Sequence, residues 1–401
     1  MAETNAVRPG EEIDVERLAA FLSSELGVDT AEIDVEQFPA GSSNLTYLVR
    51  LRENHLRQRV VTALDTKPPA YAGGSPLEYV LRRPPFGNTV KSAHDMHREF
   101  DVLSKLSKVY PPAPKPLIFV RDTSITGSEF YLMERREGLI IRGKIPGTHT
   151  LGVPPLGGSS SGELPPEGGT PNYDLFETSQ NFRLQIAKSF IQNLADLHSL
   201  DFAKAGLENM GRAEGYNRRQ VEGWTKRYFA AKTDDHPELE SAITWLNDNI
   251  PPESGASLIH NDYKFDNVML DPTDLTRVTA VLDWEMVTIG DPLMDLGTTL
   301  GYWMSSDAPE WLINMPFNPR VLMENISRRE LVEMYAEAQG HIVPNMLFYY
   351  TFGTVKIAAI CQQIYARYVK GFTRDTRFAG FDKFVGELGR IAATAIHRGH
   401  I

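Results

Sequence analysis

Side chains able to act as acids, bases or metal ligands crowd the stretch LIHNDYKFDNVMLD, between positions 258 and 271. They are His260, Asp262, Lys264, Asp266 and Asn267. Apolar pairs flank this polar set on both sides. A solvated turn between two strands would give such a pattern, and so would a catalytic loop. A carboxylate can accept a proton from a hydroxyl, and an Asp with an Asn offers the oxygen ligands that Mg²⁺ prefers.

The spacing of three of these residues narrows the chemistry. His260 precedes Asp262 by two positions and Asn267 follows it by five, which is the H-x-D-x-x-x-x-N spacing of protein-kinase catalytic loops. The segments VMLD and TAVLDWEM predict a hairpin whose second strand ends in Asp283. This hairpin would bring Asp283 beside Asp262 and Asn267. We expect Asn267 and Asp283 to share Mg²⁺, with Asp262 left to accept a proton.

The neighbouring polar residues receive different interpretations. Lys264 would reach a γ-phosphate as a point charge, and a solvated loop lysine is an equal alternative. His260 is interpreted as a structural histidine that holds the loop, and no role is assigned to Asp266. Asp291 before Pro292 predicts a helix start, with Asp295 one turn later as a second structural support. Strand parity would put Glu285 on the same side as Asp283.

The elements that must position this loop follow from hydrophobic periodicity. Apolar residues at helical spacing predict helices over residues 13–26, 92–109 and 182–198. Runs rich in β-branched and aromatic residues predict strands over 33–38, 45–51, 78–84, 116–122 and 129–135, with a hairpin turn at 41–44. Strands dominate before about position 135 and helices dominate after it. This segregation predicts an α+β protein of two lobes, residues 1–134 and 135–401.

Two segments have the composition of insertions. Residues 53–76 separate two predicted strands with polar and Pro/Gly-rich sequence, and residues 143–173 are rich in Gly, Pro and Ser. The second segment is predicted to be a flexible surface insertion. Whether either segment has a function, for example as a lid, stays open.

Composition limits the class of protein. The chain has 401 residues, of which 42% are hydrophobic, and a formal net charge of −11. A negative surface without a basic patch argues against a nucleic-acid partner. The single cysteine, Cys361, and the lack of a signal peptide or a spanning apolar run predict a soluble protein without a membrane role. We expect it in the cytoplasm or another reducing compartment, and the sequence does not indicate its oligomeric state.

Four motifs together resemble one known family. IHNDYKFDNVML, VLDWEMVTIGDPLMDLG, YVLRRPP and FPAGSSNLTYLV resemble the aminoglycoside phosphotransferase (choline kinase-like) family. They look most like its branch that occurs beside or fused to acyl-CoA dehydrogenase domains. The resemblance runs from about position 38 to 302. It implies a bilobed protein kinase-like fold, with a small antiparallel-sheet N-lobe that binds nucleotide and a larger, mainly helical C-lobe that carries catalysis and substrate binding.

The resemblance assigns roles to the motif residues. Asp262 matches the catalytic Asp of the family, and Asn267 and Asp283 match its metal ligands. Arg82 lies at the position where kinases have a phosphate-anchoring lysine, and its guanidinium group can donate hydrogen bonds to two phosphate oxygens. Arg83 takes this role if the strand parity differs by one. Glu99 matches the helix acid that pairs with this cation, and an ordinary exposed glutamate is the alternative.

The remaining nucleotide contacts follow the same resemblance. Val80 would line an adenine pocket on the face of Arg82. The loop between the first two strands would offer backbone and side-chain donors to phosphate, from Gly41, Ser42, Ser43 and Asn44. The connector between the lobes would place its residues beside the purine, namely Met133, Glu134 and Arg136.

The substrate side is the least specific part of the sequence. Trp224 and Tyr228, four positions apart, would form one face of an acceptor pocket or pack in the core. The leading hypothesis is an ATP- and Mg²⁺-dependent kinase acting on a hydroxyl of a small molecule. The branch resemblance points to a hydroxyacyl-CoA or related hydroxy acid. An aminoglycoside or amino-alcohol kinase and a non-catalytic nucleotide-binding module are the alternatives.

Overall fold

The computed structural model divides the chain into two compact units, Met1–Arg136 and Glu137–Ile401. It describes residues 4–26, 30–38, 44–53, 77–85, 95–142, 179–304, 308–315, 318–344, 346–373 and 375–401. The division falls two residues after position 134, where the sequence suggests a boundary. Positions 54–76 of the first candidate insertion, predicted over 53–76, lie outside the described residues. The same holds for the whole of the second insertion, 143–173, and for positions 41–43 of the expected turn.

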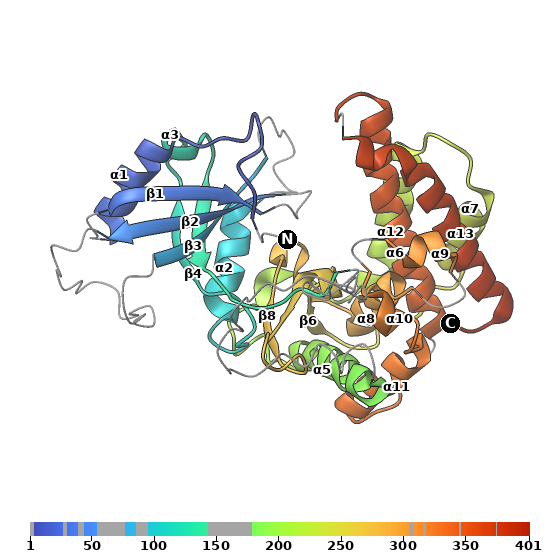
Figure 1. Ribbon diagram of the computed structural model, residues 1–401. Helices are drawn as coiled ribbons and strands as arrows, with labels where there is room; N and C mark the ends of the chain where they lie inside the picture. The colour runs from blue at the N-terminus through green and yellow to red at the C-terminus, as the bar shows by residue number, and fades with distance from the viewer. Residues whose placement is uncertain are drawn as a thin grey trace, which may run out of the picture. The chain divides into compact units, whose positions relative to one another are not determined.

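Unit 1 is built on a five-stranded antiparallel sheet in the order β1-β2-β3-β5-β4 (Figure 1). Its elements are α1 (Val15–Leu26), β1 (Thr30–Gln37), β2 (Leu45–Glu53), β3 (Leu77–Arg83), α2 (Met96–Leu106), β4 (Pro116–Val120), α3 (Thr123–Thr126) and β5 (Phe130–Glu134). Asp95 caps the start of α2 by accepting a hydrogen bond from the backbone N–H of Arg98 at 2.9 Å.

The two faces of this sheet are buried against different helices. Alternate residues of β2 and β3, such as Tyr47, Val49 and Leu81, pack in one apolar cluster with Leu18 and Leu22 of α1. Because side chains alternate along a strand, Val80 and Arg82 point to the opposite face. The helix α2 packs on β4 and β5. The period-2 pattern of β3 therefore directs Tyr79 and Leu81 into the apolar core and Arg82 to the opposite face.

Unit 2 is mainly helical and contains two short antiparallel strand pairs, β6 with β9 and β7 with β8. The strands are β6 (Ser257–Ile259), β7 (Val268–Leu270), β8 (Val278–Val281) and β9 (Thr288–Gly290), and the 3₁₀ helices beside them are η3 (Phe265–Asn267) and η4 (Trp284–Met286). The α-helices are α5 (Gln180–His198), α6 (Tyr216–Ala231), α7 (Pro237–Asp248), α8 (Pro292–Tyr302), α9 (Glu310–Ile313), α10 (Arg320–Met323), α11 (Arg328–Gln339), α12 (Met346–Val369) and α13 (Phe381–Arg398).

The long helix α12 is the centre of the helical core. It packs against α8, α6 and α13, and it runs beside α13 in Figure 1. Close approach to α8 depends on glycine, because a Cβ added at Gly353 would overlap the backbone carbonyl of Gly297. No helix among the described residues combines the length and apolar composition required to cross a membrane.

Most elements expected from the sequence are present. The helix predicted over 13–26 is α1, that over 92–109 is α2, and that over 182–198 is α5. The expected β7–β8 hairpin forms, and Asp291 caps α8 with Pro292 as its first residue. The α+β class, with a small antiparallel-sheet unit and a larger helical unit, is confirmed.

Candidate active site

Both carboxylate oxygens of Asp262 are engaged in hydrogen bonds. The hydroxyl of Tyr302, the last residue of α8, donates to Oδ1 at 2.6 Å. Lys264 donates from Nζ to Oδ2 at 2.8 Å, and the Asn267 amide donates from Nδ2 to the same oxygen at 3.0 Å. The loop after β6 therefore brings together three residues that the sequence marks as site candidates. Tyr302 joins them from a helix some 40 positions later in the chain.

These contacts keep Asp262 ionised. Burial raises the pKa of its carboxyl, but the charge and hydrogen bond of Lys264 and the bond from Tyr302 outweigh burial and hold the pKa below its ordinary value. The Lys264 ammonium shows the matching effect. Burial lowers its pKa, and the charge of Asp262 overcomes this and raises the pKa above its usual value. Asp262 is therefore a carboxylate at neutral pH, the form that can accept a proton.

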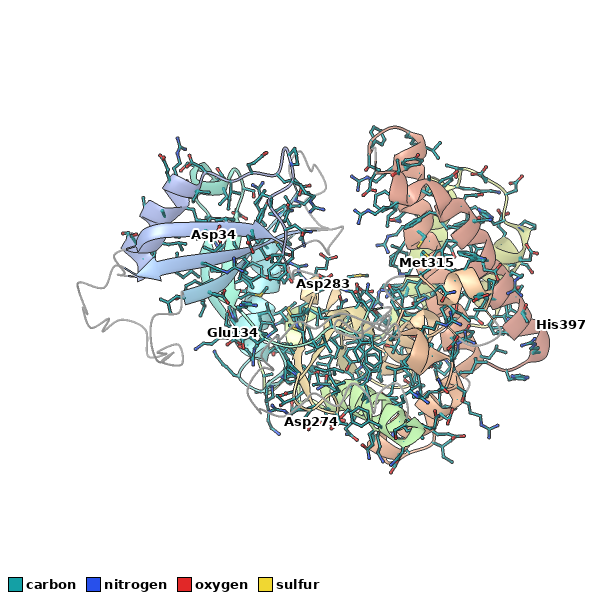
Figure 2. The ribbon with its side chains drawn as sticks, viewed as in Figure 1. Asp34, Glu134, Asp274, Asp283, Met315 and His397 are labelled. Atoms are coloured by element: carbon teal, nitrogen blue, oxygen red, sulfur yellow. The ribbon has the colours of Figure 1, made fainter. Side chains whose placement is uncertain are left out.

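Asn267 and Asp283 lie at the same end of the β7–β8 ladder. Asn267 directly precedes β7, Asp283 follows β8 by two residues (Figure 2), and the backbone N–H of Leu282 donates to the Asn267 carbonyl at 2.8 Å. The Asn267 amide nitrogen faces Asp262, so its side-chain oxygen remains the atom suited to a cation. No cluster of three His, Cys, Asp or Glu side chains with metal-binding geometry occurs in the described part of the chain. Two oxygen donors nevertheless fit Mg²⁺, which usually completes its shell with water and phosphate oxygens.

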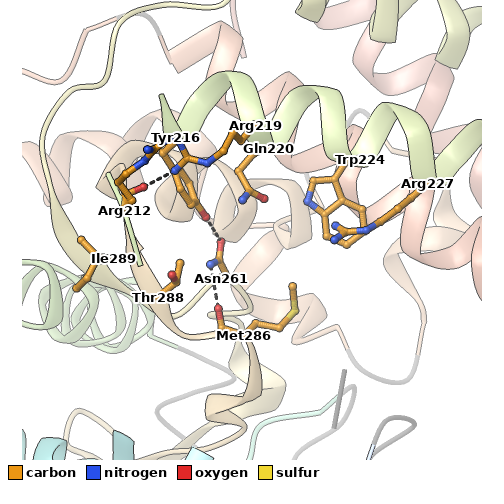
Figure 3. A pocket seen from close by; sticks show the side chains of 10 residues that line it. All are labelled: Arg212, Tyr216, Arg219, Gln220, Trp224, Arg227, Asn261, Met286, Thr288 and Ile289. Atoms are coloured by element: carbon orange, nitrogen blue, oxygen red, sulfur yellow. Dashed lines mark hydrogen bonds between the residues drawn. The ribbon is translucent and has the colours of Figure 1, made fainter. Parts of the chain in front are cut away.

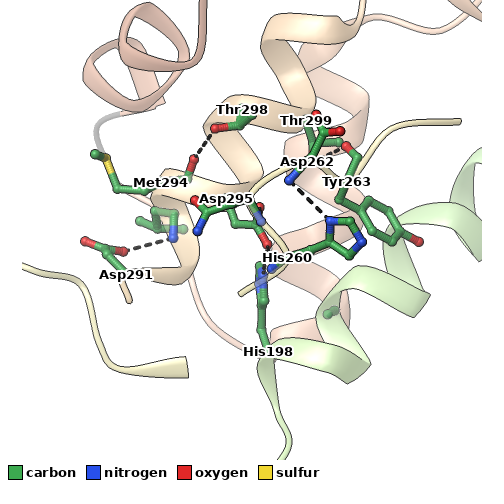
Figure 4. A network of polar contacts seen from close by, with 12 residues as sticks. His198, His260, Asp262, Tyr263, Asp291, Met294, Asp295, Thr298 and Thr299 are labelled. Atoms are coloured by element: carbon green, nitrogen blue, oxygen red, sulfur yellow. Dashed lines mark hydrogen bonds and ion pairs between the residues drawn. The ribbon is translucent and has the colours of Figure 1, made fainter. Parts of the chain in front are cut away.

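The buried carboxylate of Asp295 holds the backbone of this loop. Its Oδ2 accepts from the backbone N–H of His260 and its Oδ1 from that of Asn261, both at 2.7 Å. The ring Nε2 of His198, from the end of α5, lies 3.1 Å from Oδ2 (Figure 4). Asp295 is fully buried. It therefore acts as a support of the loop, in agreement with the interpretation from sequence.

His260 is a neutral structural residue. Its Nδ1 accepts from the backbone N–H of Asp262 at 3.2 Å, so Nε2 carries the proton and donates to the Leu282 carbonyl at 3.0 Å. Burial lowers the pKa of the imidazole. These two bonds tie the loop to the end of β8, and they place the segments that carry Asp262 and Asp283 next to each other.

Backbone strain among the described residues is concentrated at this site. Asn261 and Asp283 are the non-glycine residues there with positive φ, at 67° and 66°. Asn and Asp tolerate this left-handed conformation better than most residues, at a cost of about 1 kcal/mol or more. Hydrogen bonds hold Asn261 in it, since the side chain accepts from Tyr216 at 3.1 Å and donates to the Met286 carbonyl at 3.0 Å. Strain of this kind is found more often at functional sites than elsewhere.

Lys356 is a site residue that the sequence reasoning missed. It lies in the apolar middle of α12, is 1% exposed, and donates from Nζ to the Asn261 carbonyl at 2.6 Å. Burial lowers the pKa of its ammonium to about 8, against the opposing charges of Asp295 and Asp262. The signal available in the sequence is a single lysine within TFGTVKIAAIC, an otherwise uncharged helical run.

In unit 1 the proposed phosphate-anchoring cation is paired with the expected helix acid. Arg82 Nε lies 3.1 Å from Glu99 Oε2, and both side chains are almost fully buried. Glu99 is thus not an ordinary exposed helix residue. Arg83 points to the other face of β3, where its guanidinium donates to the Thr126 carbonyl. The strand parity therefore favours Arg82 over Arg83 as the residue that pairs with α2.

The other nucleotide candidates of unit 1 lie in β3, in and after β5, and next to β2. Val80 and Met133 are cross-strand partners in β3 and β5, and both are nearly buried. The Glu134 carboxylate accepts from the Lys115 backbone N–H at 2.7 Å and pairs with Arg136 at 2.8 Å. Asn44 is buried at the start of β2. The other three loop candidates, Gly41, Ser42 and Ser43, lie outside the described residues.

A pocket of about 460 Å³ opens beside the loop after β6 in unit 2 (Figure 3). Asn261 and Met286 line one side of it, and α6 contributes Trp224 and two arginines to the other. The second aromatic candidate, Tyr228, is fully buried and is not among the lining residues. Of the two alternatives that the sequence left open, Trp224 therefore lines the pocket and Tyr228 packs in the core.

The structure also places two further acids, Glu285 and Asp266. Glu285 belongs to the 3₁₀ helix η4, which begins directly after Asp283, so strand parity does not apply to it. Asp266 forms an ion pair with Arg142. This contact gives Asp266 a structural role in anchoring the segment that precedes position 143.

The geometry agrees with a comparison to protein families. The sequence model of the family described as "Phosphotransferase enzyme family" matches residues 34–151 and 164–316, more than half of the chain. The chain belongs to this family. The family resemblance that the motifs indicate is thereby confirmed.

Individual relatives extend this result. The chain is 34% identical over 343 residues to "Acyl-CoA dehydrogenase family member 11" of Gallus gallus, a match that covers 83% of the chain and 39% of that protein. A solved putative aminoglycoside phosphotransferase from Ralstonia eutropha superposes with a TM-score of 0.66 at 26% identity, covering 96% of this chain and 99% of the other. Choline kinase from Cryptosporidium parvum shares the fold, with a TM-score of 0.56 at 12% identity over 96% and 97% of the two chains. The chain thus spans about two fifths of the curated relative and nearly all of both solved structures.

Proposed function

We propose that this phosphotransferase uses ATP and Mg²⁺ to transfer the γ-phosphate to a hydroxyl of a small molecule. The hydrogen-bonded set around Asp262 is the observation that carries the proposal. Its carboxylate is ionised and accepts hydrogen bonds from Tyr302, Lys264 and the Asn267 amide. Asn267 and Asp283 lie at the same end of the β7–β8 ladder. Phosphoryl transfer to an alcohol needs a proton acceptor, charge neutralisation and in-line positioning.

Each residue of the set has a defined role in this proposal. Asp262 accepts the proton of the attacking hydroxyl, and Lys264 places positive charge beside it for the transferred phosphate. Asn267 and Asp283 are the residues that would hold Mg²⁺. When bound, Mg²⁺ supplies positive charge to the phosphate oxygens. In unit 1, Arg82 positioned by Glu99 would contact phosphate oxygens, with the loop ending at Asn44.

The purine part of ATP is assigned to the paired strands β3 and β5 of unit 1. Val80 and Met133 offer neighbouring apolar side chains for the adenine ring, and the chain after β5 at Glu134 and Arg136 offers backbone groups to its edge. Supporting this assignment, Val80 is on the same face of β3 as Arg82.

For the acceptor we propose a hydroxyacyl-CoA or a related hydroxy acid. The curated relative is named as an acyl-CoA dehydrogenase family member, so its name suggests an acyl-CoA compound. The proposed phosphate transfer requires that this compound carry a hydroxyl. The shared region covers only part of that relative, and the acyl substrate is accordingly part of the proposal. An aminoglycoside substrate has support from the name of the Ralstonia eutropha structure.

A direct transfer assay tests the proposal. The full chain is incubated with ATP, Mg²⁺ and hydroxyacyl-CoAs, hydroxy acids, amino alcohols or aminoglycosides, and phosphorylated product is detected by mass spectrometry. We expect ATP-dependent product with at least one acyl compound. Nucleotide binding without transfer to any hydroxyl would contradict the proposed enzyme, and transfer to aminoglycosides alone would contradict the proposed acceptor.

A further inference from the structure

The pocket beside the catalytic loop has a charge opposite to that of the whole protein. Three arginines line it, Arg212, Arg219 and Arg227, and no carboxylate is among its lining residues. The chain as a whole carries a formal net charge of −11. Overall composition therefore does not explain the arginines here, and like charges close together are unfavourable unless something compensates them.

Helical spacing gathers these side chains on one face. Tyr216, Gln220 and Trp224 follow each other at intervals of four in α6, and Arg219 and Arg227 lie in the same stripe. Figure 3 shows this stripe facing the segment that carries Asn261 and Met286. Because Asn261 directly precedes Asp262, a molecule held in this pocket lies against the catalytic loop.

The guanidinium groups retain donors for a ligand. Arg219 donates to the backbone carbonyls of Glu214 and Arg212, which fixes its position and leaves further N–H groups of its five. Arg227 lies over the Trp224 ring, with 4.5 Å from its guanidinium carbon to the ring centroid. Throughout the described ranges, none of the three pocket arginines forms an ion pair with a carboxylate.

A second observation also indicates a missing acceptor. Trp224 is 6% exposed and its indole N–H, which is buried, has no hydrogen-bond partner within the part of the chain that the structure describes. A buried donor without a partner is unfavourable. An oxygen atom of a ligand in the pocket would satisfy this N–H together with the guanidinium donors beside it.

We propose that this pocket binds an oxyanion, either a carboxylate or a phosphate, that is carried by the hydroxyl acceptor. Planar guanidinium groups recognise both oxyanions through paired hydrogen bonds. The acceptor is then an anionic alcohol, and an amino alcohol or a polycationic aminoglycoside would be repelled by three like charges. This inference rests on the proposed function and names the substrate class of the same site.

Four matched acceptors test which charge on the acceptor the pocket prefers. They are a hydroxyacyl-CoA, the free hydroxy acid, the neutral amide of that acid, and an amino alcohol of equal chain length, each assayed with ATP and Mg²⁺. We expect a KM for an anionic acceptor at least about tenfold below that of the amide, since a hydrogen bond to a charged group has this effect. The free acid presents a carboxylate and the CoA thioester presents phosphates, so the lower KM of the two identifies the oxyanion.

Arginine variants test the location of the site. Arg227→Gln and Arg212→Gln should each raise the KM for the preferred anionic acceptor about tenfold, and should raise the KM for the neutral amide by a smaller factor. The matched control is Arg218→Gln, because Arg218 lies on the same helix, outside the pocket, with its guanidinium 3.7 Å from Glu222. Unchanged KM values in both pocket variants, or an amino alcohol as the best acceptor, would overturn the anion site while the phosphotransferase proposal stands.

A binding measurement keeps the two proposals separate. Calorimetric titration of the full chain with the hydroxy acid and with the CoA thioester, without ATP, does not depend on turnover. Binding that weakens about tenfold in Arg227→Gln supports the anion site. If such binding is found but no acceptor is phosphorylated in the transfer assay, only the proposed function fails. No binding of either anion, or binding that the variants leave unchanged, overturns the anion site.

Discussion

Tyr302 and Lys264 hold the Asp262 carboxylate from two sides, one on each oxygen. This arrangement keeps the group ionised, but the attacking hydroxyl needs one of these oxygens. Lys264 also lies over the Tyr302 ring, with its Nζ 4.9 Å from the ring centroid. We infer that substrate binding displaces one of the two contacts, and the tyrosine hydroxyl is the weaker partner because it carries no charge.

Lys356 gives a prediction on the pH dependence of stability. Its pKa is about 8 in the folded chain and near 10.5 when exposed. Below pH 8 both folded and unfolded chains carry the proton, and folding bears the full cost of burying the charge. Between these two pKa values the unfolded chain binds more protons, so the free energy of unfolding rises with pH. The rise amounts to about 3 kcal/mol.

The measurement compares wild type with Lys356→Met by urea denaturation at pH 7 and pH 10. We expect the stability of wild type relative to the variant to increase over this interval. A constant difference between the two proteins would show that Lys356 does not titrate as its burial implies.

Asp295 provides a second prediction at the level of single residues. Asp295→Asn removes the charge that accepts two backbone N–H bonds and presents an amide NH₂ towards donors. We expect a loss of stability of about 3 kcal/mol and a fall in kcat. Urea denaturation and steady-state kinetics measure the two effects. The matched variant Asp274→Asn, at an exposed turn, should change kcat little, and an equal fall in both variants would contradict a specific role of Asp295.

Motif spacing predicted the residues close in sequence to Asp262, and it missed those that tertiary packing brings there. Asn267 and Lys264 lie within five positions, so local spacing is informative. Tyr302 and Lys356 come from helices that begin far along the chain, and only the packing of α8 and α12 brings them to the loop. The positive φ of Asn261 is likewise a property of the folded backbone.

Among the elements, α6 and α12 predict opposite effects of the same substitution. Gly223 lies inside α6, where an added Cβ meets no atom within 4 Å. Gly223→Ala should therefore stabilise the protein by about 1 kcal/mol, because alanine favours the helix. Gly353→Ala should destabilise it by about 1–3 kcal/mol, since its Cβ would overlap the backbone of Gly297 in α8.

Chemical denaturation of the two variants and wild type tests this pair. A stabilised Gly353→Ala variant would mean that α8 and α12 do not approach as closely as the structure shows. A destabilised Gly223→Ala variant would mean that other atoms fill the space beside Gly223, which is open in the structure.

Hydrophobic periodicity predicted the elements well where one face is buried. The strands of unit 1 and the helices α1, α2 and α5 have clear patterns because each packs one side on a core. The same reasoning extended the strand parity of β8 too far, to Glu285, because β8 ends at Val281 and a 3₁₀ helix begins directly after the left-handed Asp283. The stripe of α6 mixes polar and aromatic residues, so its sequence does not separate a pocket wall from core packing.

At the scale of the whole molecule, magnesium and nucleotide should stabilise the folded chain together. ATP with Mg²⁺ at about 100 times Kd is expected to add about 2.7 kcal/mol, by mass action on the folded state. Omitting Mg²⁺ should reduce this gain, and Asp283→Asn should remove the part that depends on Mg²⁺. Thermal unfolding with and without ATP and with and without Mg²⁺ measures this stabilisation. Equal stabilisation of wild type and Asp283→Asn by Mg²⁺ would contradict the assignment of Asp283.

The family of the whole chain was predictable because four motifs occur in one order along it. Acceptor identity was not, because the pocket joins residues of α6 with the loop before Asp262. Its arginines occur singly among other residues in the sequence, and their shared orientation depends on the fold.

The most direct test of the central claim is the rate of phosphate transfer by Asp262→Asn, measured beside Asp266→Asn. The two changes remove the same charge from the same loop, and Asp266 is engaged with Arg142. We predict that Asp262→Asn lowers kcat by about 10²–10⁴-fold with ATP still bound, as expected when a general base is lost. Asp266→Asn should retain most of the activity. An Asp262→Asn enzyme that transfers phosphate at the wild-type rate would contradict the account.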